Sequence, residues 1–207
     1  MTITYRYGDN LYVNVTNRCP NACEFCLRAT GDKVGDSGSL WFEYEPTKEE
    51  IWDSIQQRDL TEYRQLVFCG FGEPACRLEE VLWVCQQVRA VSPIPIRINT
   101  NGLSDLIHKK PTASLFAGNF DMVSVSLNAP TPEKYDALCH SEYGLAALPA
   151  VLKFTHEVTA YVPYVRMTVV DTMPPKDLEE CRRLCEETGA KFEVRHYEPD
   201  WQDSPKT

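Results

Sequence analysis

The sequence predicts an α/β fold in which a mainly parallel sheet forms a partial (β/α)6 barrel. Short β-branched runs alternate with stretches of helical periodicity along the chain, which is typical of βαβ units. Six such steps fit within the 207 residues, two fewer than a closed eightfold barrel has. Polar residues along one face of the predicted strands indicate, in addition, a splayed barrel whose interior holds ligands.

Six β-branched runs mark the strands in chain order. They are Leu11–Thr16, Gln65–Cys69, Ile94–Asn99, Met122–Asn128, Tyr161–Val170 and Lys191–Tyr197. We expect them to form one core domain over residues 1–198, followed by a polar tail over residues 199–207.

Helical signals fall between these strands. Thr47 begins the first helix, because Glu50 three residues later completes a capping box. Thr131 and Pro132 give another helix a cap and a proline at its first position. The helical segments are Lys48–Gln57, Leu78–Val91, Leu103–Phe116, Pro132–Leu138, Leu145–Glu157 and Pro175–Thr188. The segment Leu27–Pro46 is long for a connection between a strand and a helix, and we expect it to cover a site.

Composition narrows the classes of function. A net charge of −9 argues against a nucleic-acid backbone as the main partner. No apolar run approaches the roughly 18 residues that a membrane helix needs, and the N-terminal segment lacks the pattern of a signal peptide. We therefore expect a cytoplasmic protein with no membrane partner. Its nine cysteines should then serve as metal ligands or core residues, not form disulfides.

Polar and apolar side chains alternate along the predicted strands. Because helices cover the outside of a βα barrel, the polar faces should point inward. A closed barrel fills its interior with aliphatic side chains, and arginines cannot be packed dry there without a large desolvation cost. The expected lumen residues are Asn14, Thr16, Arg97, Asn99, Ser124, Ser126, Asn128, Arg166, Thr168, Glu193 and Arg195.

Cys19, Cys23 and Cys26 form a Cys-x3-Cys-x2-Cys run directly after the first predicted strand. Three thiolates with no fourth alongside suit a [4Fe–4S] cluster that keeps one iron open. A structural zinc site or a ferredoxin-type cluster would need a fourth protein ligand. We expect the other cysteines to lie in the core, and Cys76 is the one whose role stays open.

Three further polar segments follow predicted strands: Gly70–Pro74, Thr100–Gly102 and Ser126–Asn128. They should meet at the carboxyl edge of the sheet, where βα folds carry their sites. With the cysteine run and its aromatic residue Phe25, they make the whole chain resemble the radical S-adenosylmethionine (SAM) superfamily. The signature of that superfamily is Cys-x3-Cys-x-aromatic-Cys. The resemblance implies a partial barrel of the radical SAM type, with a [4Fe–4S] cluster and SAM as cofactors. Phe71 departs from the commonest pattern, which has a second glycine there.

The resemblance also implies an activity and residue roles. An electron from the cluster cleaves SAM, and the 5′-deoxyadenosyl radical removes hydrogen from a substrate. Gly72 and Glu73 would hold the methionine amino group, since glycine permits close backbone approach and a carboxylate pairs with an ammonium. Arg166 suits the methionine carboxylate. The remaining SAM candidates are Phe25, expected against the adenine, and Asn99, Asn101, Ser126 and Asn128, expected near the ribose.

Some assignments stay open. Asn101 and Asn128 are also plausible as turn residues. Arg97, Glu193 and Arg195 are candidates for binding substrate. For the two arginines, pairing with Glu193 as structural lumen charges is an equal alternative.

Within the superfamily, the segment Thr2–Arg28 most resembles the TatD-associated radical SAM proteins, which implies a TatD-type hydrolase as a functional partner. Compact glycyl-radical activases and 7-carboxy-7-deazaguanine synthases are alternatives, although Leu27 stands where the latter commonly carry threonine. A non-catalytic iron–sulfur electron carrier and a zinc-binding module belong to different classes; Glu73 and the polar lumen argue against the electron carrier. We expect a small polar or peptide substrate and a low-potential electron donor of the flavodoxin or ferredoxin type.

Overall fold

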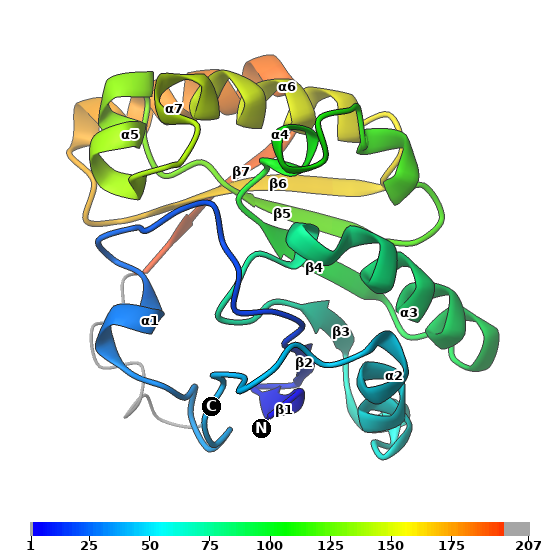
Figure 1. Ribbon diagram of the computed structural model, residues 1–207. Helices are drawn as coiled ribbons and strands as arrows, with labels where there is room; N and C mark the ends of the chain where they lie inside the picture. The colour runs from blue at the N-terminus through cyan, green and yellow to red at the C-terminus, as the bar shows by residue number, and fades with distance from the viewer. Residues whose placement is uncertain (1, 197–207) are drawn as a thin grey trace.

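A curved sheet of seven strands forms the framework of residues 2–196, the part of the chain that the computed structural model describes (Figure 1). The strands lie side by side in chain order: β1 (Thr4–Tyr7), β2 (Asn10–Val13), β3 (Gln65–Phe68), β4 (Ile96–Thr100), β5 (Met122–Ser126), β6 (Tyr164–Val170) and β7 (Lys191–Arg195). Neighbouring strands from β2 to β7 are parallel. The predicted α/β fold with a mainly parallel sheet is confirmed.

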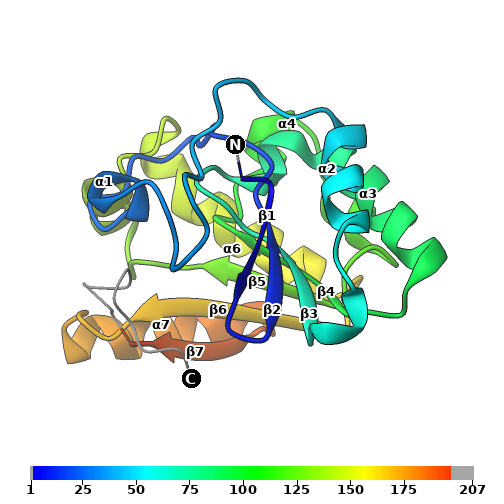
Figure 2. The ribbon, with the colours of Figure 1, turned by 90° about the horizontal axis from the view of Figure 1, so that it is seen from below.

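Helices cover the convex face of the sheet, and the concave face opens toward the segment that carries α1 (Figure 1). The helices of the convex face are α2 (Lys48–Gln56), α3 (Leu78–Val91), α4 (Ser104–His108), α5 (Pro132–Cys139), α6 (Ala147–Val158) and α7 (Pro175–Thr188), whereas α1 (Leu27–Thr30) lies on the concave side. Figure 2 shows α7 lying along β6 and β7. The capping box that begins α2 is present: Glu50 N donates to Thr47 Oγ1, and Thr47 N donates to the Glu50 carboxylate. None of the described helices is long and apolar enough to cross a membrane.

The main core lies between the sheet and these helices. The apolar residues that alternate with the polar ones along the strands are fully buried there, as expected from the pattern. From β4 and β5 they include Ile96, Ile98, Val123 and Val125. Removing such a side chain from water contributes roughly 1.5–3 kcal/mol. The apolar face of the sheet therefore points outward, and its polar face lines the lumen.

Several elements differ from the predicted ones, and three of the differences have a clear local form. An antiparallel strand, β1, precedes the first predicted strand and joins β2 through a two-residue turn, where Gly8 has a φ of +55°. The predicted helix Leu103–Phe116 divides into α4 and a 3-10 turn, because Lys109 is left-handed and Pro111 follows it. β2 ends at Val13, three residues earlier than predicted. The expected strand end at Tyr197 and the boundary at residue 198 lie outside the described residues.

The segment Leu27–Pro46 covers one side of the lumen, as expected from its length. Leu40 from this segment packs with Tyr5 and Phe71 in a small apolar cluster on the concave face, separate from the main core. Asn14 holds it there: its Nδ2 donates to Leu40 O at 2.7 Å, and its Oδ1 accepts from Phe71 N at 3.3 Å. Asn14 was predicted to face the lumen, and the structure shows that it serves to anchor this segment.

Candidate functional site

Cys19, Cys23 and Cys26 lie on the loop between β2 and α1, and Cys26 is the N-cap residue that directly precedes α1. All three are partly buried. Burial raises the pKa of the Cys19 thiol to about 12 and also raises that of Cys26. These thiols are therefore protonated at neutral pH in the metal-free chain, so that binding of a metal must release their protons.

Cys23 contacts a fourth thiol, that of Cys139 at the end of α5. Cys23 donates a hydrogen bond to Cys139, and this bond, together with burial, raises the pKa of Cys23. Asn128 Nδ2 lies 3.4 Å from the Cys139 sulfur on the other side. Within residues 2–196, no three His, Cys, Asp or Glu side chains are arranged to hold a metal ion. To act as a ligand, Cys23 must exchange its contact with Cys139 for a metal.

The donor set nevertheless fits the predicted cluster. Three thiols on one short loop suit an iron–sulfur cluster, and this loop supplies no fourth ligand of its own. The loop itself is held in place by backbone hydrogen bonds to α5: Ala22 N donates to Cys139 O at 2.9 Å, and Glu24 N donates to Leu138 O at 3.1 Å.

The turn after β3 holds the other side of the cysteine loop. Glu73 N donates to Arg18 O at 2.8 Å. A Cβ atom on Gly72 would overlap the carbonyl oxygens of Thr16 and Arg18. Glycine is therefore required here because the turn packs directly against the backbone that leads into the cysteines. The predicted role of Gly72 in holding the methionine amino group stays a prediction.

The Glu73 carboxylate is buried and accepts three hydrogen bonds from the protein. Oε1 accepts from Thr100 Oγ1 at 2.7 Å and from Ala75 N at 2.9 Å, while Oε2 accepts from Asn101 N at 2.7 Å. Burial raises the pKa of Glu73, and these hydrogen bonds oppose that shift. The carboxylate thus joins the turns after β3 and β4. Its pairing with the methionine ammonium stays a prediction.

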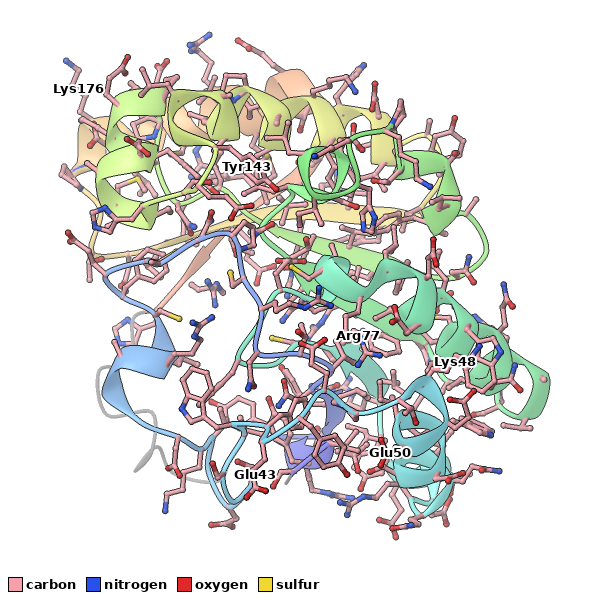
Figure 3. The ribbon with its side chains drawn as sticks, in the orientation of Figure 1. Glu43, Lys48, Glu50, Arg77, Tyr143 and Lys176 are labelled. Carbon is pink, nitrogen blue, oxygen red and sulfur yellow. The ribbon has the colours of Figure 1, made fainter. Side chains whose placement is uncertain are left out.

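A buried arginine contacts the chain on both sides of the cysteine loop. Arg77, labelled in Figure 3, lies between β3 and the start of α3 and donates to Val15 O at 3.1 Å and to Pro46 O. It also forms ion pairs with Glu80 at 3.1 Å and Glu45 at 3.7 Å. Arg77 therefore joins the entry of the cysteine loop to the end of the Leu27–Pro46 segment.

A cavity of about 630 Å³ opens beside the cysteine loop, at the carboxyl ends of β5 and β6. It brings together Phe25 and Asn128, two of the residues predicted to bind SAM. The other lining residues are Glu24, Ala129, Pro130, Lys134, Ala137, Leu138, Val170, Thr172, Met173, Pro174 and Asp177. The aromatic face of Phe25, with apolar neighbours such as Leu138 and Met173, suits an adenine ring.

The remaining predicted SAM residues are placed as follows. Asn99 Oδ1 is buried and has no hydrogen-bond partner among the described residues, so it fits a hydroxyl donor such as a ribose. Asn101 Oδ1 accepts from Leu103 N at 3.0 Å, which is the turn role, while its Nδ2 lies 4.0 Å from the Cys19 sulfur. Ser126 is partly buried and lies in register with Thr168 on β6.

Arg166 already has a carboxylate partner. Its Nη1 lies 2.6 Å from Glu193 Oε2, and its Nε donates to Ser124 Oγ at 3.0 Å. An ion pair of Glu193 with Arg97 or Arg195 was the expected structural alternative. Glu193 does form a structural ion pair in the lumen, but its partner is Arg166. Arg97 Nη2 donates to Tyr12 Oη at 3.1 Å, and the Arg195 side chain is exposed.

No sequence pattern singled out Cys139, Tyr12 or Thr100 as site residues. Each contacts a predicted site residue only because segments far apart in the chain meet in the fold. Cys76 lies near the site: burial and the neighbouring charge of Glu73 together raise the pKa of its thiol to about 12.

A family model of the radical SAM superfamily matches residues 13–187. The chain belongs to this superfamily, whose enzymes use a [4Fe–4S] cluster and SAM as cofactors. Two solved structures share the fold. A radical SAM methyltransferase from Sphaerobacter thermophilus aligns with a TM-score of 0.59 at 16% identity, covering 93% of this chain and 68% of that one. Streptococcus suis SuiB bound to S-adenosylmethionine aligns with a TM-score of 0.65 at 17% identity, covering 96% and 41%.

Two curated proteins are related in sequence. A probable GTP 3′,8-cyclase from Methanosarcina acetivorans is 32% identical over 132 residues, covering 63% of this chain and 36% of the relative. A probable RNA methyltransferase from Sorangium cellulosum is 29% identical over 144 residues, covering 63% and 33%. The chain therefore spans about a third of the length of the curated relatives that it matches.

Proposed function

We propose that this enzyme removes a hydrogen atom from a small polar substrate held in the lumen of the partial barrel. The cluster, when bound, supplies an electron that cleaves SAM and so generates the 5′-deoxyadenosyl radical. The observation that supports the proposal is the polar lumen beside the cysteine loop. Arg97 Nε and Asn99 Oδ1 there are buried without a hydrogen-bond partner among residues 2–196, and such atoms call for a polar ligand.

In this proposal, Cys19, Cys23 and Cys26 hold the cluster. Phe25 and Asn128 line the cavity for the adenosyl group, and Asn99 accepts a hydrogen bond from the ribose. Glu73 and Gly72 hold the cysteine loop against the turns after β3 and β4. An electron carrier would need neither a cavity of this size nor unpaired polar groups in its interior.

The test is anaerobic reconstitution with iron and sulfide, followed by reduction with dithionite in the presence of SAM. We expect 5′-deoxyadenosine and methionine, identified by mass. Cys23→Ala should abolish both products. Cys85→Ala, which alters a thiol buried in the main core, should retain the cluster and the products. A fully loaded cluster that neither binds nor cleaves SAM would contradict the proposal and favour the electron carrier.

The physiological partners form a second part of the proposal. We propose a low-potential flavodoxin- or ferredoxin-type protein in the cytosol as the electron donor, and a TatD-type hydrolase as a functional partner. The support for the hydrolase is the resemblance of Thr2–Arg28 to the TatD-associated proteins. A purified TatD-type hydrolase should consume the enzyme's product. GTP belongs in the first substrate panel because one relative is a probable GTP cyclase.

A further inference from the structure

Arg97 is a buried cation without an anion. Its side chain is on the concave face of β4, and only 9% of the residue is exposed. Nη2 donates to Tyr12 Oη at 3.1 Å, whereas Nε is buried and has no hydrogen-bond partner in the described part of the chain. None of the ion pairs within residues 2–196 includes Arg97. Among the other buried or half-buried arginines near the lumen, Arg77 and Arg166 each pair with a glutamate, and Arg28 donates to the backbone oxygens of Asn17 and Phe71.

An unpaired guanidinium in this position is costly. Removing one partner of a buried ion pair typically destabilises a protein by about 3–5 kcal/mol, because the remaining charge is left uncompensated. The hydroxyl of Tyr12 carries no charge to offset it. A bound ligand with a negative charge would compensate the charge of this guanidinium.

The sheet register places Arg97 deep in the lumen. Arg97 pairs with Val67 on β3 and Met122 on β5, whereas Asn99 pairs with Ser124, one step nearer the carboxyl edge. At roughly 3.3 Å per residue, Arg97 lies about 7 Å below Asn99 and about 13 Å below Asn101, the residue beside Cys19. An anion bound to Arg97 is therefore separate from a cofactor bound at the cysteine loop.

The two unpaired atoms, Asn99 Oδ1 and Arg97 Nε, differ in their hydrogen-bonding role. Asn99 Oδ1 is an acceptor and fits a hydroxyl of the cofactor, whereas Arg97 Nε is a donor and fits an oxygen anion. The free edge of a guanidinium matches the two oxygens of a carboxylate. Glu193 already neutralises Arg166, so Arg97 is the buried arginine on the polar strand faces that is left for an anion. A carboxylate, with two oxygens in one plane, matches a single guanidinium.

We propose that Arg97 binds a carboxylate group of the substrate at the floor of the lumen, with Tyr12 orienting the guanidinium. This inference rests on the proposed function, because it assigns the lumen to substrate. The substrate is then a small carboxylic acid bound by its carboxylate at the closed end. The carbon that loses hydrogen lies toward the cysteine loop, about 7–13 Å from the carboxylate by the same rise per residue.

The experiment compares two ligands of equal shape on the reconstituted protein with SAM bound. Butyrate and its neutral amide, butyramide, are each added at constant ionic strength, and the thermal unfolding midpoint is recorded. At about ten times its dissociation constant, butyrate should raise the midpoint by roughly 3–6 °C. Butyramide and sodium chloride should leave it unchanged. The butyrate shift should vanish in Arg97→Gln and persist in Arg64→Gln, an exposed arginine that pairs with Asp9 at 3.8 Å.

Further measurements separate the alternatives. Arg97→Met should raise the midpoint of the ligand-free protein because it removes an uncompensated buried charge; a fall would show that Arg97 is structural and overturn the proposal. The dissociation constant of SAM should keep its wild-type value in Arg97→Gln, and a weakened affinity would assign Arg97 to the cofactor instead. A shift with inorganic phosphate but not with butyrate would replace the carboxylate by a phosphate.

Failure of the two proposals can be told apart. If the wild type cleaves SAM but butyrate does not stabilise it, the carboxylate site is wrong and the radical activity stands. If butyrate stabilises the wild type through Arg97 but SAM is not cleaved, the site stands as an anion site and the proposed function is wrong.

Discussion

The thiol of Cys23 donates a hydrogen bond to Cys139, which lies at the end of α5, far along the chain. A predicted cluster ligand is thus paired in the metal-free chain with a cysteine from outside the signature run. Cys139 in turn contacts Asn128, a residue of the cavity beside the loop. The pair therefore connects the cysteine loop with the proposed binding site for the adenosyl group.

Cys139→Ala should speed cluster assembly without lowering the final iron content. The substitution removes the partner with which a metal competes for Cys23. We expect several-fold faster growth of the visible absorbance during reconstitution, and the same iron and sulfide per chain as in the wild type. Cys181→Ala, a buried thiol of α7, is the matched control and should assemble at the wild-type rate. A loss of iron in Cys139→Ala would show instead that Cys139 is a ligand.

Gly72→Ala should displace the turn after β3 from the cysteine loop. The added Cβ would meet backbone oxygens, which cannot move aside as a flexible side chain can. Overpacking of this kind costs about 1–3 kcal/mol of unfolding free energy, measurable by urea denaturation, and should also lower cluster retention. Gly118→Ala is the control: Gly118 has a φ of +71° and open space around it, so its replacement should destabilise the fold and leave the cluster intact.

Glu73→Gln tests whether this residue joins the two turns or binds the cofactor alone. An amide cannot accept all three hydrogen bonds that the carboxylate accepts, so we expect a loss of about 1–3 kcal/mol of stability in the absence of SAM. Glu142→Gln, at an exposed position, should have no such effect. If Glu73→Gln lowered SAM affinity and left the unfolding free energy unchanged, the joining role described here would be refuted.

Substitutions of Arg166 and of Glu193 should change the affinity for SAM in opposite directions. If Arg166 binds the methionine carboxylate, Glu193 competes with the cofactor for the same guanidinium. Arg166→Gln should then weaken SAM binding, whereas Glu193→Gln should strengthen it. Isothermal titration of the reconstituted protein with SAM measures both. Equal, unchanged affinities in the two variants would restrict this ion pair to a structural role, with a coupling energy of about 1 kcal/mol or less.

The order of strands and helices and the position of the cysteines followed from local patterns. Alternation along β4 and β5 separated the outer core residues Ile98 and Val125 from the lumen residues Asn99 and Ser124, because a strand has a period of two. The prediction of one long helix from Leu103 was wrong. The apolar residues keep helical spacing past Lys109, but the left-handed backbone of Lys109 and the proline at position 111 end the helix there.

The partners of the site residues could not be predicted in this way. Glu73 was singled out correctly as part of the turn after β3, yet its hydrogen bonds to Thr100 and Asn101 depend on how two neighbouring strands end. Arg166 and Glu193 were both placed in the lumen, but the choice of Arg166 as the partner of Glu193 depends on register between β6 and β7. Such contacts arise from tertiary packing, which short patterns do not encode.

The hydrogen bonds between the cysteine loop and α5 have a consequence for the biogenesis of this enzyme. Ala22 and Glu24 are bonded to Cys139 and Leu138, which are synthesised more than 100 residues after the loop. These two hydrogen bonds therefore form only after α5 has been made. Full support of the cysteine loop thus follows the synthesis of α5.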